Sequence, residues 1–168
     1  MKPIIFTLVG ADKPGLIESL AKTVYQYGGN WLRSNFSHMA GHFAGFVEID
    51  LPEEQHQALI DAFNAHPDLK ITLMSAAGRE AKFPNTAVIN IMGNDKPGIV
   101  QEVTGVLNQF NINIRSFDSV CESAPNWGSE LFKAQAVIAI PDDFDLDTLA
   151  ERLEHIANDM VVDIDLQQ

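Results

Sequence analysis

One segment of the chain occurs twice, and this repeat constrains the fold more than any other feature of the sequence. Residues 10–17 (GADKPGLI) recur 83 positions later as residues 93–100 (GNDKPGIV), with five of the eight pairs identical. The apolar positions of the segment that follows match at the same offset, in the pairs Leu16 and Ile99, Leu20 and Val103, and Val24 and Leu107. Apolar residues with this spacing form one face of a helix. The repeat therefore predicts two copies of one small domain.

A polar segment separates the two copies. Residues 79–85 contain charged residues and a proline and follow a glycine, as is typical of a short tether. We expect one domain over residues 1–78, a linker over 79–85 and a second domain over 86–168.

Each copy begins with the pattern of a strand, a loop and a helix. Short apolar runs at residues 4–9 and 87–92 predict strands, and helices should follow to about residues 28 and 109. Proline has a fixed φ and no N–H, so Pro14 and Pro97 suit the first helical turn. Asp12 and Asp95 then lie close enough to cap these helices.

The rest of each copy predicts a hairpin, a second helix and a last strand. The hairpins are expected at 30–39 with 43–51 and at 112–121 with 131–140, the second helices after Pro52 and Pro141, and the last strands at 69–76 and 161–166. The acidic residues 142–147 are interpreted as a helix start. The order βαββαβ, found twice, predicts an α+β fold of two ferredoxin-like domains, each a four-stranded antiparallel sheet with two helices on one face.

Composition excludes several classes of protein. The formal net charge is -12, which disfavours direct contact with nucleic acid or with anionic lipid. No apolar run reaches the length of about 20 residues that spans a bilayer, and the N-terminal segment does not have the pattern of a secretory signal. The one cysteine, Cys121, fits a reducing compartment, so we expect a cytoplasmic protein without a disulfide.

The repeated Asp-Lys-Pro-Gly loops are the candidate ligand site. A helix N-terminus with a nearby glycine favours a carboxylate group, and an aspartate in the same loop favours an ammonium group. The pair of features suits a zwitterionic amino acid. The same residues also have a purely structural explanation, in which aspartate caps the helix and glycine permits the turn.

These loops, together with Gly28-Gly29-Asn30 in the first copy and Asn111-Ile112-Asn113 in the second, resemble the tandem ACT-domain proteins. Over essentially the whole chain, the sequence is most similar to the glycine cleavage system transcriptional repressor family. The resemblance implies a repressor that senses an amino acid, with glycine as the candidate, and that contacts a DNA-binding activator without binding DNA itself. It also implies a homodimer.

The resemblance carries eight ligand-binding positions over to this chain. They are Asp12, Gly15, Leu16 and Asn30 in the first copy, and Asp95, Gly98, Ile99 and Asn113 in the second. Trp31 departs from the smaller aliphatic residue of many ACT sequences, and Ile114 stands at the matching position of the second copy. The two copies are therefore not expected to share one pocket shape.

Other kinds of chemistry find weaker support. His38 and His42 flank the first hairpin turn and form a candidate metal site with Glu48, but they lack a familiar ligand spacing. Cys121 has no base near it in sequence and is interpreted as a structural thiol. We expect no catalytic residues, metal or cofactor. Two alternatives remain open: a small enzyme of the acylphosphatase type, although neither first loop contains an arginine, and a structural protein-interaction module.

Overall fold

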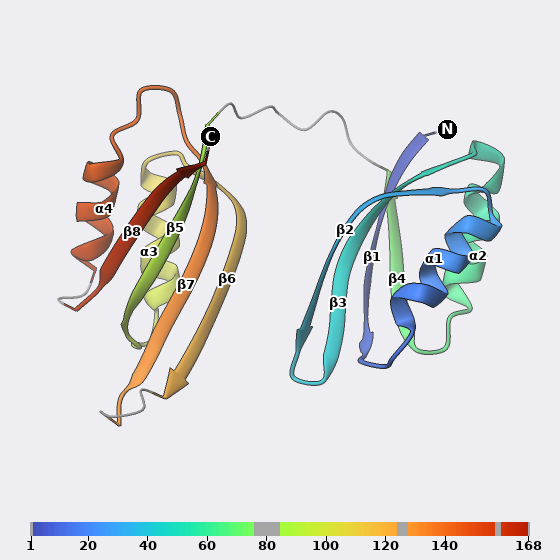
Figure 1. Cartoon of the computed structure of the whole chain (residues 1–168), viewed down its shortest axis with the longest axis horizontal. Coiled ribbons are helices and arrows are strands. Elements are labelled where there is room, and N and C mark those ends of the chain that lie inside the picture. The colour runs from blue at the N-terminus through green and yellow to red at the C-terminus, as the bar shows by residue number, and fades with distance from the viewer. Residues whose placement is uncertain (1, 76–84, 124–127, 157–158, 168) are drawn as a thin grey trace. The chain divides into compact units, whose positions relative to one another are not determined.

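Each copy of the repeat folds into its own four-stranded sheet with two helices (Figure 1). The structure is a computed structural model and describes residues 2–75, 85–123, 128–156 and 159–167. The chain divides into two compact units, Met1–Arg79 (unit 1) and Glu80–Gln168 (unit 2). Of the expected linker, residues 79–85, only Asn85 belongs to the described residues.

The elements follow the predicted order in both units. Unit 1 contains β1 (Lys2–Ala11), α1 (Leu16–Gln26), β2 (Asn30–Met39), β3 (His42–Leu51), a short 3-10 helix (Glu53–Gln55), α2 (His56–Asn64) and β4 (Leu69–Ser75). Unit 2 contains β5 (Thr86–Asn94), α3 (Ile99–Gln109), β6 (Asn113–Ser123), β7 (Glu130–Ala139), α4 (Leu146–Glu154) and β8 (Val161–Gln167). None of the helices in the described parts of the chain is long and apolar enough to cross a membrane.

The sheets have the same strand order, β2-β3-β1-β4 in unit 1 and β6-β7-β5-β8 in unit 2. All of their strand pairs are antiparallel. In each unit, both helices cover one face of the sheet (Figure 1). The prediction of two ferredoxin-like domains is confirmed.

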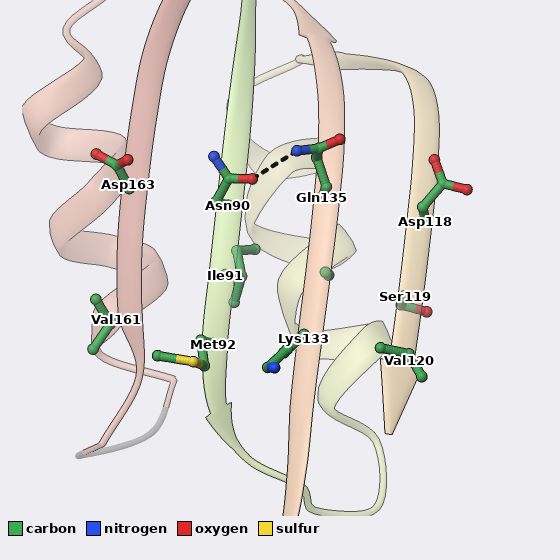
Figure 2. A pocket seen from close by; sticks show the side chains of 11 residues that line it. Asn90, Ile91, Met92, Asp118, Ser119, Val120, Lys133, Gln135, Val161 and Asp163 are labelled. Carbon is green, nitrogen blue, oxygen red and sulfur yellow. Dashed lines mark hydrogen bonds between the residues drawn. The ribbon is translucent and has the colours of Figure 1, made fainter. Parts of the chain in front are cut away.

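Alternation along the strands builds a separate core in each unit. Ile4, Phe6 and Leu8 of β1 are buried with Leu20 of α1, while Ile89 of β5 belongs to the core of unit 2. Successive side chains of a strand point to opposite faces, so one face of each sheet is buried beneath the helices and the other is uncovered. Figure 2 shows the uncovered face of unit 2.

The predicted starts of the first helices are wrong. α1 and α3 begin after Gly15 and Gly98, so Pro14 and Pro97 lie outside the helices rather than in their first turn. No side chain caps either helix, and the expected capping by Asp12 and Asp95 is therefore also wrong. A glycine in the left-handed conformation occupies the cap position and turns the chain into the helix instead.

The last helix starts later than predicted. α4 begins at Leu146 rather than directly after Pro141, and Asp145 caps it by accepting hydrogen bonds from the backbone N–H groups of Asp147 and Thr148. The Thr148 hydroxyl also donates to this carboxylate, at 2.7 Å. These bonds favour the charged form and hold the pKa of Asp145 below its ordinary value, with the Thr148 side chain as the largest cause. Asp145 and Asp147 form the helix start, as the sequence indicated, whereas Asp142 and Asp143 precede it.

Candidate ligand loops

The two Asp-Lys-Pro-Gly loops are attached to the neighbouring hairpins in the same way. The backbone N–H of Asp12 donates to the carbonyl oxygen of Gly41 at 3.0 Å, and that of Asp95 donates to the carbonyl oxygen of Glu130 at 2.8 Å. Each aspartate therefore stands where the first strand of the unit ends, beside the turn end of the hairpin. This attachment fixes the loop without using the carboxylates.

Gly15 and Gly98 give the loops their shape. Their φ angles are +85° and +86°, in the region that L residues other than glycine rarely adopt. A Cβ atom at either position would meet nothing within 4 Å. Glycine is needed here for its conformation, and the space beside it stays open toward the first turn of the helix, whose N–H groups lack partners within the helix.

A hollow of about 180 Å³ lies at the loop of unit 1. Its lining comes from the loop, the first turn of α1 and the start of β3: Asp12, Lys13, Gly15, Leu16, Ile17, Glu18 and Phe43. Apolar side chains thus stand beside carboxylates and a helix N-terminus. Three of the residues that the sequence predicted, Asp12, Gly15 and Leu16, are brought together here.

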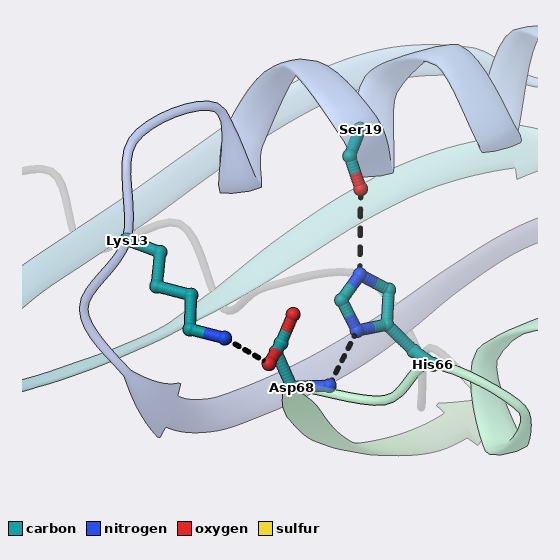
Figure 3. A network of polar contacts seen from close by, with 4 residues as sticks. All are labelled: Lys13, Ser19, His66 and Asp68. Atoms are coloured by element: carbon teal, nitrogen blue, oxygen red, sulfur yellow. Dashed lines mark hydrogen bonds and ion pairs between the residues drawn. The ribbon is translucent and has the colours of Figure 1, made fainter.

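A polar network holds the base of this loop (Figure 3). Lys13 forms an ion pair with Asp68, and His66 accepts a hydrogen bond from the Asp68 backbone N–H at 3.2 Å. The other ring nitrogen of His66 lies 3.3 Å from the Ser19 hydroxyl. Because Lys13 is already paired, the carboxylates of Asp12 and Glu18 set the charge of the hollow and favour a cationic group.

His38 adds a group to this site that sequence reasoning missed. Its Nε2 lies 3.7 Å from Oδ2 of Asp12, and both side chains are about half exposed. In unit 2, Cys121 stands at the position of His38 and faces Asp95 in the same way. The pair of Asp12 and His38 and the pair of Asp95 and Cys121 are 83 positions apart, like the two copies of the repeat. Extending the alignment of the repeat to the hairpins could therefore have identified both pairs from the sequence.

The pKa of the Cys121 thiol lies above its ordinary value. Partial desolvation is the largest cause, followed by the hydrogen bond to Asp95 and the negative charges of Asp95 and Glu130. Cys121 is an exposed residue, so desolvation is limited and the carboxylate of Asp95 is the cause that a variant can remove. The thiol is therefore predominantly protonated at neutral pH and weakly nucleophilic.

Asp95→Asn is expected to lower the pKa of the Cys121 thiol, because it removes the carboxylate that opposes the thiolate. At pH 8 more of the thiol is then ionised, and alkylation by iodoacetamide should become about two- to fivefold faster. Mass spectrometry of Cys121 over time measures this rate. Asp12→Asn is the matched control, since it makes the same change in unit 1, and an unchanged rate in Asp95→Asn would contradict the assignment.

The loop of unit 2 is held by different bonds. Lys96 donates to the carbonyl oxygen of Ile156 at 2.9 Å and pairs with Glu102 at 2.7 Å. The Asn94 backbone N–H donates to Asp159 at 2.7 Å. Gly98 and Ile99 occupy the places of Gly15 and Leu16, so the two units share a backbone frame while its polar partners differ.

Two predicted site residues lie away from the loops. Asn30 is the first residue of β2 and pairs with Asp50, whereas His38, beside Asp12, lies eight residues further along that strand. At about 3.3 Å per residue, the separation is on the order of 26 Å. Asn113 is the first residue of β6 and lies at the corresponding end of its sheet. The structure therefore does not bring either asparagine to a loop.

The other sequence candidates have structural roles. The weak candidate metal site at His38, His42 and Glu48 is not assembled, because His38 and His42 point to opposite faces of the sheet and Glu48 pairs with Arg33. No group of three or more potential ligands able to hold a metal ion occurs among the described residues. Trp31 is partly buried and packs against the core of unit 1, edge-on to Phe6 at 6.1 Å between ring centroids.

Comparison with known families agrees with this geometry. A model of the ACT domain matches residues 2–71, and a second model of the ACT domain matches residues 87–158. The chain is a tandem ACT-domain protein. Both matches contain the loop and the helix that the internal repeat defined. No match was found among curated protein sequences.

Two solved structures of similar length share this tandem ACT fold. A protein of unknown function from Galdieria sulphuraria is 24% identical with a TM-score of 0.82, over 99% of this chain and 97% of its own. A protein named as a candidate glycine cleavage system transcriptional repressor is 18% identical with a TM-score of 0.67, over 99% and 98%. At these identities the similarity concerns the fold. ACT domains indicate regulation by small molecules, and the chain is a regulatory protein in this sense.

Proposed function

We propose that this tandem ACT-domain protein senses a small amino acid at the loop of unit 1 and represses the glycine cleavage system through a DNA-binding activator. The observation that carries the proposal is the hollow beside Gly15, where Asp12 and the N-terminus of α1 meet. The Asp12 carboxylate accepts a hydrogen bond from the ligand ammonium group, and the N–H groups of the first turn of α1 donate hydrogen bonds to the ligand carboxylate.

The size of the hollow supports a small ligand. The volume of about 180 Å³ lies below the range of about 300–1,000 Å³ that is usual for sites of drug-sized ligands, and glycine has only five non-hydrogen atoms. A larger side chain would extend past Ile17 and Phe43, which line the hollow, and glycine is therefore the first candidate.

Binding at this site exchanges one partner of Asp12 for another. In the structure, Asp12 faces His38 at 3.7 Å, a long contact between two half-exposed side chains. An ammonium group at hydrogen-bond distance is a stronger partner for the carboxylate. In unit 2 the Cys121 thiol faces Asp95 in place of the imidazole, and the hollow beside the loop belongs to unit 1, so we place the ligand in unit 1.

The partner of the protein follows from charge and from the likeness to the named repressor. A net charge of -12 repels DNA, so an effect on transcription requires a DNA-binding protein as intermediary. Homodimerisation and a cytoplasmic location belong to the same proposal.

Asp12→Asn is expected to weaken glycine binding about tenfold or more. The variant keeps the size of the side chain and removes the charge that a charge-assisted hydrogen bond needs, and such bonds contribute about 1.5–3 kcal/mol. Isothermal titration calorimetry of the whole chain with each of the twenty amino acids, preceded by a thermal-shift screen, measures the affinities.

Asp95→Asn provides the matched control, with an expected change in affinity below about threefold. Equal glycine affinity in Asp12→Asn and the parent protein would remove the loop of unit 1 from the site. An absence of any amino-acid response in the parent protein, at millimolar concentrations, would refute the sensing role.

A further inference from the structure

The uncovered face of the unit 2 sheet carries two neighbouring rows of side chains that cross all four strands (Figure 2). The strand register places Asp118, Gln135, Asn90 and Asp163 in the first row, and Val120, Lys133, Met92 and Val161 in the second. Both rows line a hollow of about 550 Å³. We call this surface the acidic sheet face.

The second row is the apolar part of the acidic sheet face. Met92, Val120 and Val161 are 43%, 50% and 57% exposed. Lys133, the one cation of the row, forms an ion pair with Glu122. Met92 and Val161 are thus presented to solvent side by side, and Val120 follows beyond Lys133, whose charge the ion pair neutralises.

The first row is polar and ends in two carboxylates. Gln135 donates to Asn90 at 2.9 Å, so the two central amides satisfy part of each other's hydrogen-bonding capacity. Asp118 and Asp163 stand on the outer strands and have no ion pair or hydrogen bond within the described parts of the chain. Three strand spacings of about 4.8 Å separate them, or about 14 Å.

The equivalent sheet face of unit 1 carries different side chains, so the fold does not require the residues of the acidic sheet face. The equivalent rows of unit 1 are Asn35, Phe46, Thr7 and Thr72, and Ser37, Ala44, Val9 and Lys70. Both carboxylates are absent there, and a 57% exposed Phe46 replaces Gln135. The combination of an apolar row with two separated carboxylates therefore belongs to unit 2 alone.

The open shape and the negative charge of the acidic sheet face indicate which class of partner can bind there. An open sheet face cannot enclose a small molecule, which is usually buried over most of its surface. Two copies of this face would bring four carboxylates together, which is unfavourable. The equivalent rows of unit 1 in a second copy offer a single cation, Lys70, for two carboxylates. A cationic, partly apolar segment of another protein fits both features.

We propose that the acidic sheet face binds an amphipathic helical segment of a partner protein, with two basic residues spaced to meet Asp118 and Asp163 beside an apolar stripe. This inference rests on the proposed function, because a DNA-binding activator supplies such a segment. Proteins that bind DNA neutralise phosphates with lysine and arginine. A basic segment held on this face is withheld from DNA, and the protein represses without touching DNA.

The test uses the whole chain and a short labelled helical peptide in fluorescence anisotropy. Two lysines of the peptide, eleven positions apart, lie on one side of the helix with a separation of about 16 Å, and leucines form the adjoining stripe. We expect Asp118→Asn with Asp163→Asn to weaken binding about three- to tenfold. Val161→Lys, which introduces the unit 1 residue into the apolar row, should weaken it by more than about tenfold.

Glu54→Gln with Asp61→Asn is the matched control, because it removes two exposed carboxylates from unit 1. We expect less than about a twofold change in peptide affinity. Equal losses in the two double variants would overturn the proposal, since binding would then depend on net charge alone. Equal binding of a peptide with the same composition and its lysines four positions apart would also overturn it.

Two further measurements separate this inference from the sensing role and from self-association. The thermal shift with amino acids should be the same in the parent protein and in Asp118→Asn with Asp163→Asn, because these residues lie outside the ligand loop. Failure of peptide binding with a normal amino-acid response refutes the acidic sheet face and leaves the sensor. A dimer that dissociates in Val161→Lys, seen by sedimentation, would show that a second copy occupies the face and would overturn the proposal.

Discussion

Phe6→Ala is expected to destabilise unit 1 by about 3–5 kcal/mol and to leave the stability of unit 2 unchanged. Phe6 is fully buried on the central strand β1, and its ring packs against Phe63 at 4.8 Å between centroids and against Trp31. Loss of a buried phenylalanine costs about 3–5 kcal/mol. A domain of this size has a free energy of unfolding of about 4–11 kcal/mol, so the change removes much of its stability.

Two-dimensional ¹H–¹⁵N NMR of the whole chain in increasing urea measures this outcome, because the dispersed peaks of unit 1 should collapse at a lower urea concentration than in the parent protein while those of unit 2 collapse at the same concentration. Ile89→Ala is the matched control. Ile89 is fully buried at the equivalent position of β5, so its loss should affect unit 2 alone. Simultaneous collapse of both sets of peaks in either variant would show that the two cores are not independent.

Gly10→Ala is expected to destabilise unit 1 by about 1–3 kcal/mol, the range for overpacking a closely packed site. A Cβ atom at Gly10 would lie 2.2 Å from the carbonyl oxygen of Asp68 and 2.7 Å from Cδ2 of Leu69. Because the first of these neighbours is backbone, β1 and the start of β4 must move apart. Urea unfolding followed by circular dichroism measures the loss.

Gly93→Ala is the control that the repeat itself provides. Gly93 occupies the same position in unit 2, yet its added Cβ would lie 3.3 Å from Cα of Met160. A small shift of the neighbouring backbone accommodates that contact, and we expect a loss below about 1 kcal/mol. Equal destabilisation by the two substitutions would contradict the difference in packing between the two positions.

The fold was predictable from the sequence because the repeat and the alternation of apolar residues are independent signals for the same elements. The run from Phe43 to Leu51 alternates along a strand that is covered on one face, and the structure places it in β3. Helix starts were not predictable in the same way. A proline fits the first turn of a helix and also fits the position just before the N-cap. Only the left-handed φ angle of Gly15 shows that this glycine is the N-cap and that Pro14 precedes the helix.

The candidate site was predictable only where it lies within one continuous segment. Asp12, Gly15 and Leu16 come from one loop, and the hollow unites them. His38 lies on β2 and comes close to Asp12 because of the pairing register of β2 and β3, and this register could not be derived from the sequence. Asn30 lies beyond α1 in the chain, and this helix carries the chain from the loop to the other end of the sheet, where β2 begins at Asn30.

The separation of the two cores has a consequence for synthesis of the protein on the ribosome. Every strand and helix of unit 1 precedes β5 in the chain, and all of its sheet pairs are formed between residues 2 and 75. Unit 1 is thus able to complete its sheet while β5 to β8 are still being translated. By the time the second copy of the loop and helix pattern emerges, the strands of unit 1 are already paired with one another. The order of translation therefore limits mispairing between the two copies of the repeat.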